Sequence, residues 1–146
     1  MANADTVKAI ITNIEGILSS SPHLLLKINI PGGVTETLPS FTANPVYYVM
    51  YDGETPEYEH GQKPGYMESS FVIVLVWLSG SISAARDKSI EWFHALRTAL
   101  PVNALNAGDL ATTKLVSRVT VEKPDVDMQP AETKILFRAS VRYREA

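Results

Sequence analysis

The feature that most constrains the fold is an uninterrupted apolar run at residues 71–78, Phe-Val-Ile-Val-Leu-Val-Trp-Leu. Its β-branched and aromatic side chains favour a strand, and it is far shorter than the roughly 20 residues that a membrane-spanning helix needs. Alternate side chains of a strand point to opposite faces. Both faces of this strand are therefore apolar, and the second face carries Val72, Val74, Val76 and Leu78.

Two interpretations of this second face remain open. An antiparallel sheet with helices on one side normally presents a polar face to water on the other. Either another part of the same chain covers the second face, or a neighbouring subunit does. Because an exposed apolar patch on an isolated subunit marks an interaction site, we treat the four side chains named above as candidate subunit contacts.

Two helices are predicted, one before and one after the first three strands along the sequence. Residues 5–19 carry one apolar stripe and are followed by Pro22, which cannot continue a helix. The second helix is expected from a Ser83 cap to residue 100, just before Pro101. Its expected apolar stripe consists of Ile90, Phe93, Arg97 and Leu100, widened by Trp92, Ala95 and Leu96.

Strands are predicted at residues 24–30, 46–51, 71–78, 114–122 and 134–143, a loop at 102–111 and a connecting segment at 123–130. The order is α-β-β-β-α-β-β. It predicts an α+β fold, a mostly antiparallel five-stranded sheet with both helices on one face. The 146 residues, 45% apolar and 20% charged, fit a single domain over 1–146.

Residues 52–69 do not follow any regular period, because breakers such as Gly53, Pro56 and Gly61 interrupt them. They predict either a long loop or a hairpin that projects from the body, with its tip near residues 60–61. Tyrosine is enriched at protein interfaces. Tyr58 and Tyr66 are therefore candidate subunit contacts.

Glu57 and Glu59 flank Tyr58 and precede His60. The two carboxylates and the imidazole could in principle offer oxygen and nitrogen ligands to a metal ion. A metal site needs at least three ligands at fixed geometry. We favour a solvated acidic tip over a metal site. The two glutamates are accordingly grouped with the candidate subunit contacts.

The last two predicted strands can be aligned by their apolar positions, with Val121 opposite Ile135 and Val119 opposite Phe137. This register gathers four basic residues on the outward face: Lys114, Arg118, Arg138 and Arg142. It also sets Arg118 directly against Arg138, an unfavourable pair unless something compensates. The face is either simply solvated or docks onto an acidic protein surface. The net charge of −3 argues against nucleic acid as the main partner.

Catalytic patterns are missing from the sequence. The chain has no cysteine, no nucleophile elbow and no phosphate-binding glycine loop, and its three histidines lie far apart along the chain. Asp125 and Asp127 lie in a polar segment between prolines, where solvated charges are the usual outcome. We expect no enzymatic activity, no cofactor and no metal. The first residues lack the pattern of a secretory signal, and we expect folding in a cytoplasm.

Three segments, together with the order of elements, give a resemblance to a known family. They are residues 71–78, the helical segment DKSIEWFHAL at 87–96 and the closing strand ILFRASVRY at 135–143. The chain resembles the tail terminator proteins of long-tailed bacteriophages over most of its length. The resemblance implies a structural protein of the virion tail and neck that assembles in the host cytoplasm.

The same resemblance implies a ring of six copies that caps the tail tube, stops its polymerisation and offers a platform to the head connector. Its partners would be further copies of the chain, the tube protein and the connector or stopper, without membrane or sequence-specific nucleic acid. A head-to-tail ring needs two different complementary patches on each subunit. The apolar sheet face and the segment 52–69 are the candidates for these patches.

Two other functions remain open. The first is another ring protein of the neck, such as a connector or stopper, which the sequence barely separates from a terminator. The second is a small-molecule-binding or enzymatic α+β domain, with a polar-lined cavity between sheet and helices. No constellation of polar residues in the sequence supports this second alternative.

Overall fold

The computed structural model describes residues 2–19, 46–59, 63–78, 81–129 and 132–145. The helices in these ranges are α1 (Asn3–Ser19), α3 (Ile82–Ala99), α4 (Val102–Leu105) and the short 3₁₀ helix η1 (Gly108–Leu110). The strands are β1 (Val46–Glu59), β2 (Lys63–Leu78), β3 (Val116–Val121), β4 (Asp125–Met128) and β5 (Glu132–Arg144). The strand expected at residues 24–30 lies outside the described residues.

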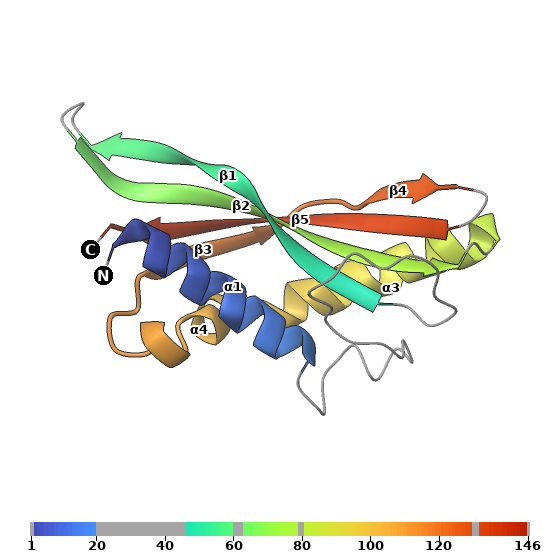
Figure 1. Cartoon of the computed structure of the whole chain (residues 1–146), viewed down its shortest axis with the longest axis horizontal. Helices are drawn as coiled ribbons and strands as arrows, with labels where there is room; N and C mark the ends of the chain where they lie inside the picture. Colours follow the sequence, from blue (N-terminus) through green and yellow to red (C-terminus); the bar gives the residue numbers. More distant parts are fainter. Residues whose placement is uncertain (1, 20–45, 60–62, 79–80, 130–131, 146) are drawn as a thin grey trace.

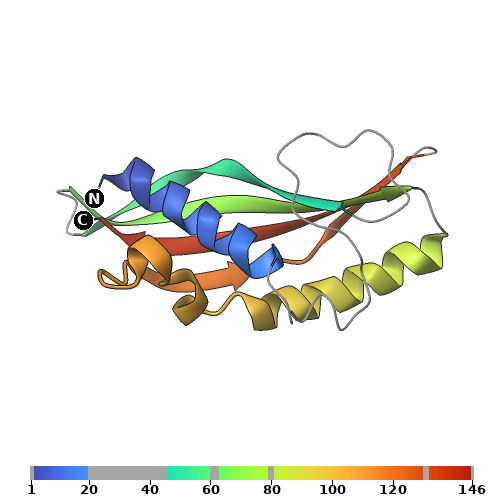
Figure 2. The same cartoon turned by 60° about the horizontal axis from the view of Figure 1, so that its bottom comes forward.

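The five strands form one antiparallel sheet in the order β1-β2-β5-β3, and β4 continues the β3 edge by pairing with the first half of β5. Helices α1 and α3 both lie on one face of this sheet (Figure 1, Figure 2). The predicted α+β fold is therefore confirmed. Strand β4 was not predicted, because its four alternating residues, Asp-Val-Asp-Met, are too short a signal between flanking prolines.

The core fills the space between the helices and the sheet. Trp92 of α3 is fully buried, edge-on to Tyr47 of β1 at 5.6 Å between ring centroids and stacked on Phe137 of β5 at 6.3 Å. The Tyr47 hydroxyl also donates a hydrogen bond to the Leu18 carbonyl, which ties the end of α1 to β1. One aromatic cluster thus links α3 to two strands.

Helix α3 begins two residues before the predicted start, since Ser81 rather than Ser83 caps it by accepting a hydrogen bond from the Ala84 amide at 3.1 Å. The predicted apolar stripe is also wrong at Ile90, whose side chain is 54% exposed. The buried face is instead centred on Trp92 and Leu96, with Ala85, Ser89 and Ala95. Packing of the large indole sets the rotation of this helix, and Ile90 is left on the outside.

The predicted register of the closing strands is wrong. Val119 pairs with Val141, and Arg118 pairs with Arg142 rather than with Arg138. The displacement is an even number of residues, so every side chain keeps its predicted face. The alternation of apolar residues cannot detect such a shift. The start of β3 is fixed instead by Asn106, whose side chain bonds both the amide and the carbonyl of Val116, at 3.0 and 2.9 Å.

Among the helices that the structure describes, none is both long and apolar enough to cross a membrane.

Candidate functional site: assembly surfaces

The segment between the second and third predicted strands is a hairpin, not a loop. Strands β1 and β2 pair antiparallel from Val46↔Val76 to Glu59↔Lys63, with irregularities between Tyr51 and Glu54 and between Glu57 and Tyr58. Strand β5 accompanies β2 only as far as Tyr66↔Arg144. The end of the hairpin therefore runs past the rest of the sheet (Figure 1). We call residues 52–59 and 63–69 the hairpin arm.

The base of the hairpin arm is held by the carboxylate of Glu54. Gly53, at φ +90°, allows the bulge that precedes this residue. The Glu54 carboxylate accepts hydrogen bonds from three hydroxyl groups, those of Tyr143 at 2.6 Å, Tyr51 at 3.0 Å and Ser69 at 3.1 Å. Burial, together with this hydrogen bond to Glu54, raises the pKa of Tyr143, so its phenol remains a donor at physiological pH.

The outward face of the arm and of β5 carries opposite charges side by side. Arg138 pairs with Asp52 at 2.8 Å and Arg118 with Glu68 at 2.9 Å. Arg142 pairs with Glu57 at 2.8 Å, and its guanidinium carbon lies 3.6 Å from the centre of the Tyr66 ring. Strands whose paired residues are 50 to 86 positions apart in the sequence are thus joined by charged side chains.

These pairs correct the expectation of a basic face. Arg118, Arg138 and Arg142 do share the outward side, as predicted, but each meets a carboxylate of the hairpin arm. Lys114 lies outside β3, at φ +50°, and is exposed. The proposed docking of these residues onto an acidic partner stays a prediction, and carboxylates of the same chain already neutralise the three arginines.

The Arg142–Glu57 pair predicts a pH dependence with a definite sign. The hydrogen bond from Arg142 lowers the pKa of Glu57, so the pair stabilises the folded state above the ordinary glutamate pKa and is lost as the pH falls through the lowered value. The difference in melting temperature between the wild type and Arg142→Gln should be largest at neutral pH and shrink as the pH falls through the lowered pKa of Glu57. Thermal unfolding followed by circular dichroism across this range measures it. A difference that stays constant down to the lowest pH would contradict the assignment.

The second face of β2 is not open to solvent. Val72, Val74 and Val76 are 8%, 4% and 1% exposed, and Tyr48 and Leu136 pack against them. Of the two interpretations of this face, cover from the same chain agrees with the structure. Contact of these valines with another subunit remains a prediction that has lost its main support. The side chains of Leu78, Tyr58 and Glu59 lie outside the description.

Exposed apolar side chains gather instead in a groove between α3 and β4. Among the described residues, four of the six large hydrophobic side chains that are exposed line it: Ile82, Ile90, Val126 and Met128, at 77%, 54%, 45% and 37% exposure. The depression has a volume of about 540 Å³. This surface was not predicted from the sequence, because Ile90 was expected in the core and residues 125–128 in a connection.

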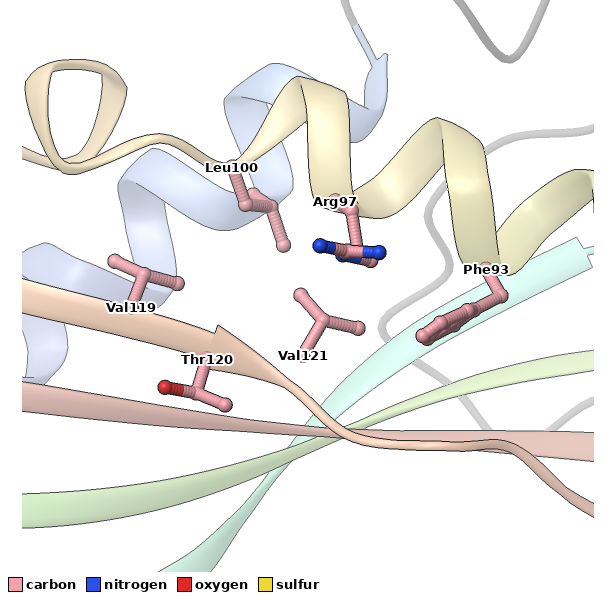
Figure 3. A pocket seen from close by; sticks show the side chains of 6 residues that line it. All are labelled: Phe93, Arg97, Leu100, Val119, Thr120 and Val121. Atoms are coloured by element: carbon pink, nitrogen blue, oxygen red, sulfur yellow. The ribbon is translucent and has the colours of Figure 1, made fainter.

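A second depression of about 320 Å³ follows further along α3, against β3 (Figure 3). Val119 and Val121 line it from the strand, and Phe93, Arg97 and Leu100 from the helix. The Arg97 guanidinium lies 5.7 Å from the centre of the Phe93 ring and no carboxylate lies within ion-pair distance of it in the described part of the chain. We call the two depressions together the α3 groove.

The described residues contain no cluster of three or more histidine, aspartate or glutamate side chains that could hold a metal ion. Glu57 is engaged by Arg142, and His60 of the same predicted acidic tip lies outside the description. The chemistry that these surfaces support is contact with another macromolecule: a charged, anchored hairpin on one side and an apolar groove with an available arginine on the other.

Comparison with models of known protein families finds no match to this chain, and comparison with curated proteins finds no significant match either.

Proposed function

We propose that this protein is a structural subunit of a phage tail, a tail terminator that forms a ring on the end of the tail tube. The ring halts polymerisation of the tube and presents a docking platform for the head connector. The family resemblance of residues 71–78, 87–96 and 135–143 suggests this role, and no relative found by comparison supports or opposes it.

The observation that carries the proposal is the hairpin arm. Of its described apolar side chains, only Met67 packs against the core, yet four ion pairs hold its outward face and the Glu54 hydroxyl cluster holds its base. Exposed ion pairs add little stability individually. An ordered projection of this kind is best explained by a partner that it contacts, and an assembly subunit has such partners.

The test is polymerisation of the tail-tube subunit of the same phage in the presence of the purified protein. We expect tubes of limited length with additional density at one end in negative-stain electron micrographs, because a cap blocks further addition. Tubes formed without the protein provide the length reference. Tubes of unchanged length and bare ends, at protein in excess over tube ends, would refute termination.

The same preparation separates the competing functions. A connector or stopper should bind the head-side partner and leave tube length unchanged. The groove beside α3 is lined mainly by apolar side chains, which suits a macromolecular contact better than the polar cavity expected of a small-molecule enzyme.

A further inference from the structure

Two strands form the opposite edges of the sheet. β1 begins the strand order β1-β2-β5-β3, and β4 continues the β3 edge at the other side. Figure 2 shows β1 and β3 on opposite sides of the sheet. Within the described ranges, β1 pairs with β2 alone and β4 with β5 alone. An edge strand of this kind offers backbone N–H and C=O groups to a strand of another chain.

Exposed apolar side chains gather at these two edges. Among the described residues, the large hydrophobic side chains that are exposed are Met50 and Tyr51 on β1, Val126 and Met128 on β4, and Ile82 and Ile90 on α3. The two α3 residues line the same depression as the two β4 residues, so they belong to the β4 edge. Apolar patches on opposite edges of one subunit are what a head-to-tail contact between copies requires.

The strand order fixes the direction in which the edges of two copies would meet. From one edge to the other the sheet runs β1, β2, β5 and β4, and each neighbouring pair is antiparallel. β1 and β4 therefore run in opposite directions. If the next copy has the same orientation, its β1 lies antiparallel to β4. The sheet then continues from copy to copy with the helices always on the same face.

The apolar side chains of the two edges also lie on the same face of the sheet. Val126 and Met128 point to the helix side, since they line the depression beside α3. Tyr51 lies on the helix side as well, since it lines a depression together with residues of α1. Val49 shares its face by alternation and packs against the core. A continued sheet therefore brings apolar residues of β1 next to those of β4.

The pattern of faces and charges selects one register. A shift by one residue would bring unlike faces together. With Met50 opposite Asp125, Val49 lies opposite Val126, and the four residues of β4 pair with residues 47–50 of β1. A shift of two residues toward the hairpin tip would set Asp52 against Asp125, which is unfavourable. It would also draw in the irregular part of β1, which begins after Tyr51.

We propose that β1 of one copy pairs with β4 of the next copy, antiparallel and with Met50 opposite Asp125. Ile82 and Ile90 of α3 cover the helix side of this joint. The contact is heterologous, because each copy uses its β1 edge toward one neighbour and its β4 edge toward the other. It rests on the proposed function only in that a closed set of such contacts is the ring.

The first experiment exchanges charges across the joint. Met50 is 51% exposed and Asp125 is exposed, so the fold tolerates substitution at both positions. Met50→Asp places like charges opposite each other and should raise the apparent Kd of self-association about tenfold or more in sedimentation velocity. Met50→Lys is the matched variant and should associate at least as well as the wild type. Combining Met50→Asp with Asp125→Lys should restore association, and circular dichroism checks that each variant is folded.

The second experiment is covalent and uses the absence of cysteine from the chain. A variant with Met50→Cys and Asp125→Cys should form a ladder of disulfide-linked oligomers under mild oxidation. Within one subunit the two positions are three strand spacings apart, about 14 Å, and a disulfide does not bridge Cα atoms more than about 7 Å apart. The control combines Met50→Cys with Asp109→Cys, an exposed position on η1 outside both edge strands, and should give no ladder.

Four results would each overturn the inference: a wild type that stays monomeric at every concentration, a Met50→Asp variant that associates like the wild type, a charge exchange that fails to restore association, or equal ladders from the two cysteine variants. Termination is judged separately, by tube length. Capped tubes from a protein that fails these tests would leave termination standing and remove this contact. Restored association and a specific ladder, without any effect on tubes, would do the reverse.

Discussion

Trp92→Ala is expected to lower the free energy of unfolding by about 3–5 kcal/mol, the usual cost of truncating a large buried aromatic side chain. Trp92 is fully buried and contacts the rings of Tyr47 and Phe137, so its loss leaves a cavity where α3 meets β1 and β5. A domain of this size has a total stability of about 5–15 kcal/mol. Urea unfolding followed by circular dichroism measures the change.

Two other substitutions in α3 serve as controls for this prediction. Ile90→Ala, on the exposed side of the same helix, should cost about 0.5 kcal/mol or less. Trp92→Phe should cost clearly less than Trp92→Ala, since it retains an aromatic ring and removes an indole N–H that finds no acceptor in the described part of the chain. Equal losses from Ile90→Ala and Trp92→Ala would contradict the placement of α3 on the sheet.

Glu54→Ala is the second large prediction, with an expected loss of roughly 2–6 kcal/mol from two hydroxyl groups that lose their acceptor at about 1–3 kcal/mol each. Those groups are the hydroxyls of Tyr143 and Ser69, both on residues without solvent exposure. The same urea titration measures this loss, and amide hydrogen exchange should show faster opening in the hairpin arm than in α3.

Glu54→Gln is the matched variant, because its amide oxygen can still accept a hydrogen bond while the negative charge is gone. It should therefore lose less stability than Glu54→Ala. Glu57→Ala removes a carboxylate of the exposed outward face and should have a still smaller effect. If Glu54→Ala and Glu57→Ala destabilise the protein equally, the hydroxyl cluster does not hold the base of the arm.

The fold class was accessible from sequence because it depends on local periodicity. The apolar stripe of α1 indicates a helix from its own residues alone. The apolar run of β2 and the alternation of apolar and polar residues in β5 indicate strands in the same way. The hairpin arm was anticipated only as one of two alternatives, since glycines and prolines break the alternation by which a strand is recognised. Its pairing along β2 overcomes these breaks by means of two irregularities in register.

The candidate assembly surfaces were harder to predict from the sequence than the fold class. The sequence correctly placed Arg118, Arg138 and Arg142 on one face, but their acidic partners come from β1 and β2, between 50 and 86 residues away along the chain. No local pattern reports a partner at such a separation. The α3 groove was missed for a similar reason: the exposure of Ile90 depends on how Trp92 rotates the helix, and this rotation depends on Phe137 and Tyr47.

The sequence by itself determined the helices α1 and α3, the existence and order of β1, β2, β3 and β5, and the faces to which the residues of the predicted strands point, because these follow from the 3.6- and 2-residue periods of the backbone. Only the tertiary structure decided the register of β3, the cover over Val72, Val74 and Val76, and the neutralisation of the outward arginines. These depend on contacts between residues distant in sequence. A shift by an even number of residues leaves the local pattern unchanged and moves every cross-strand partner.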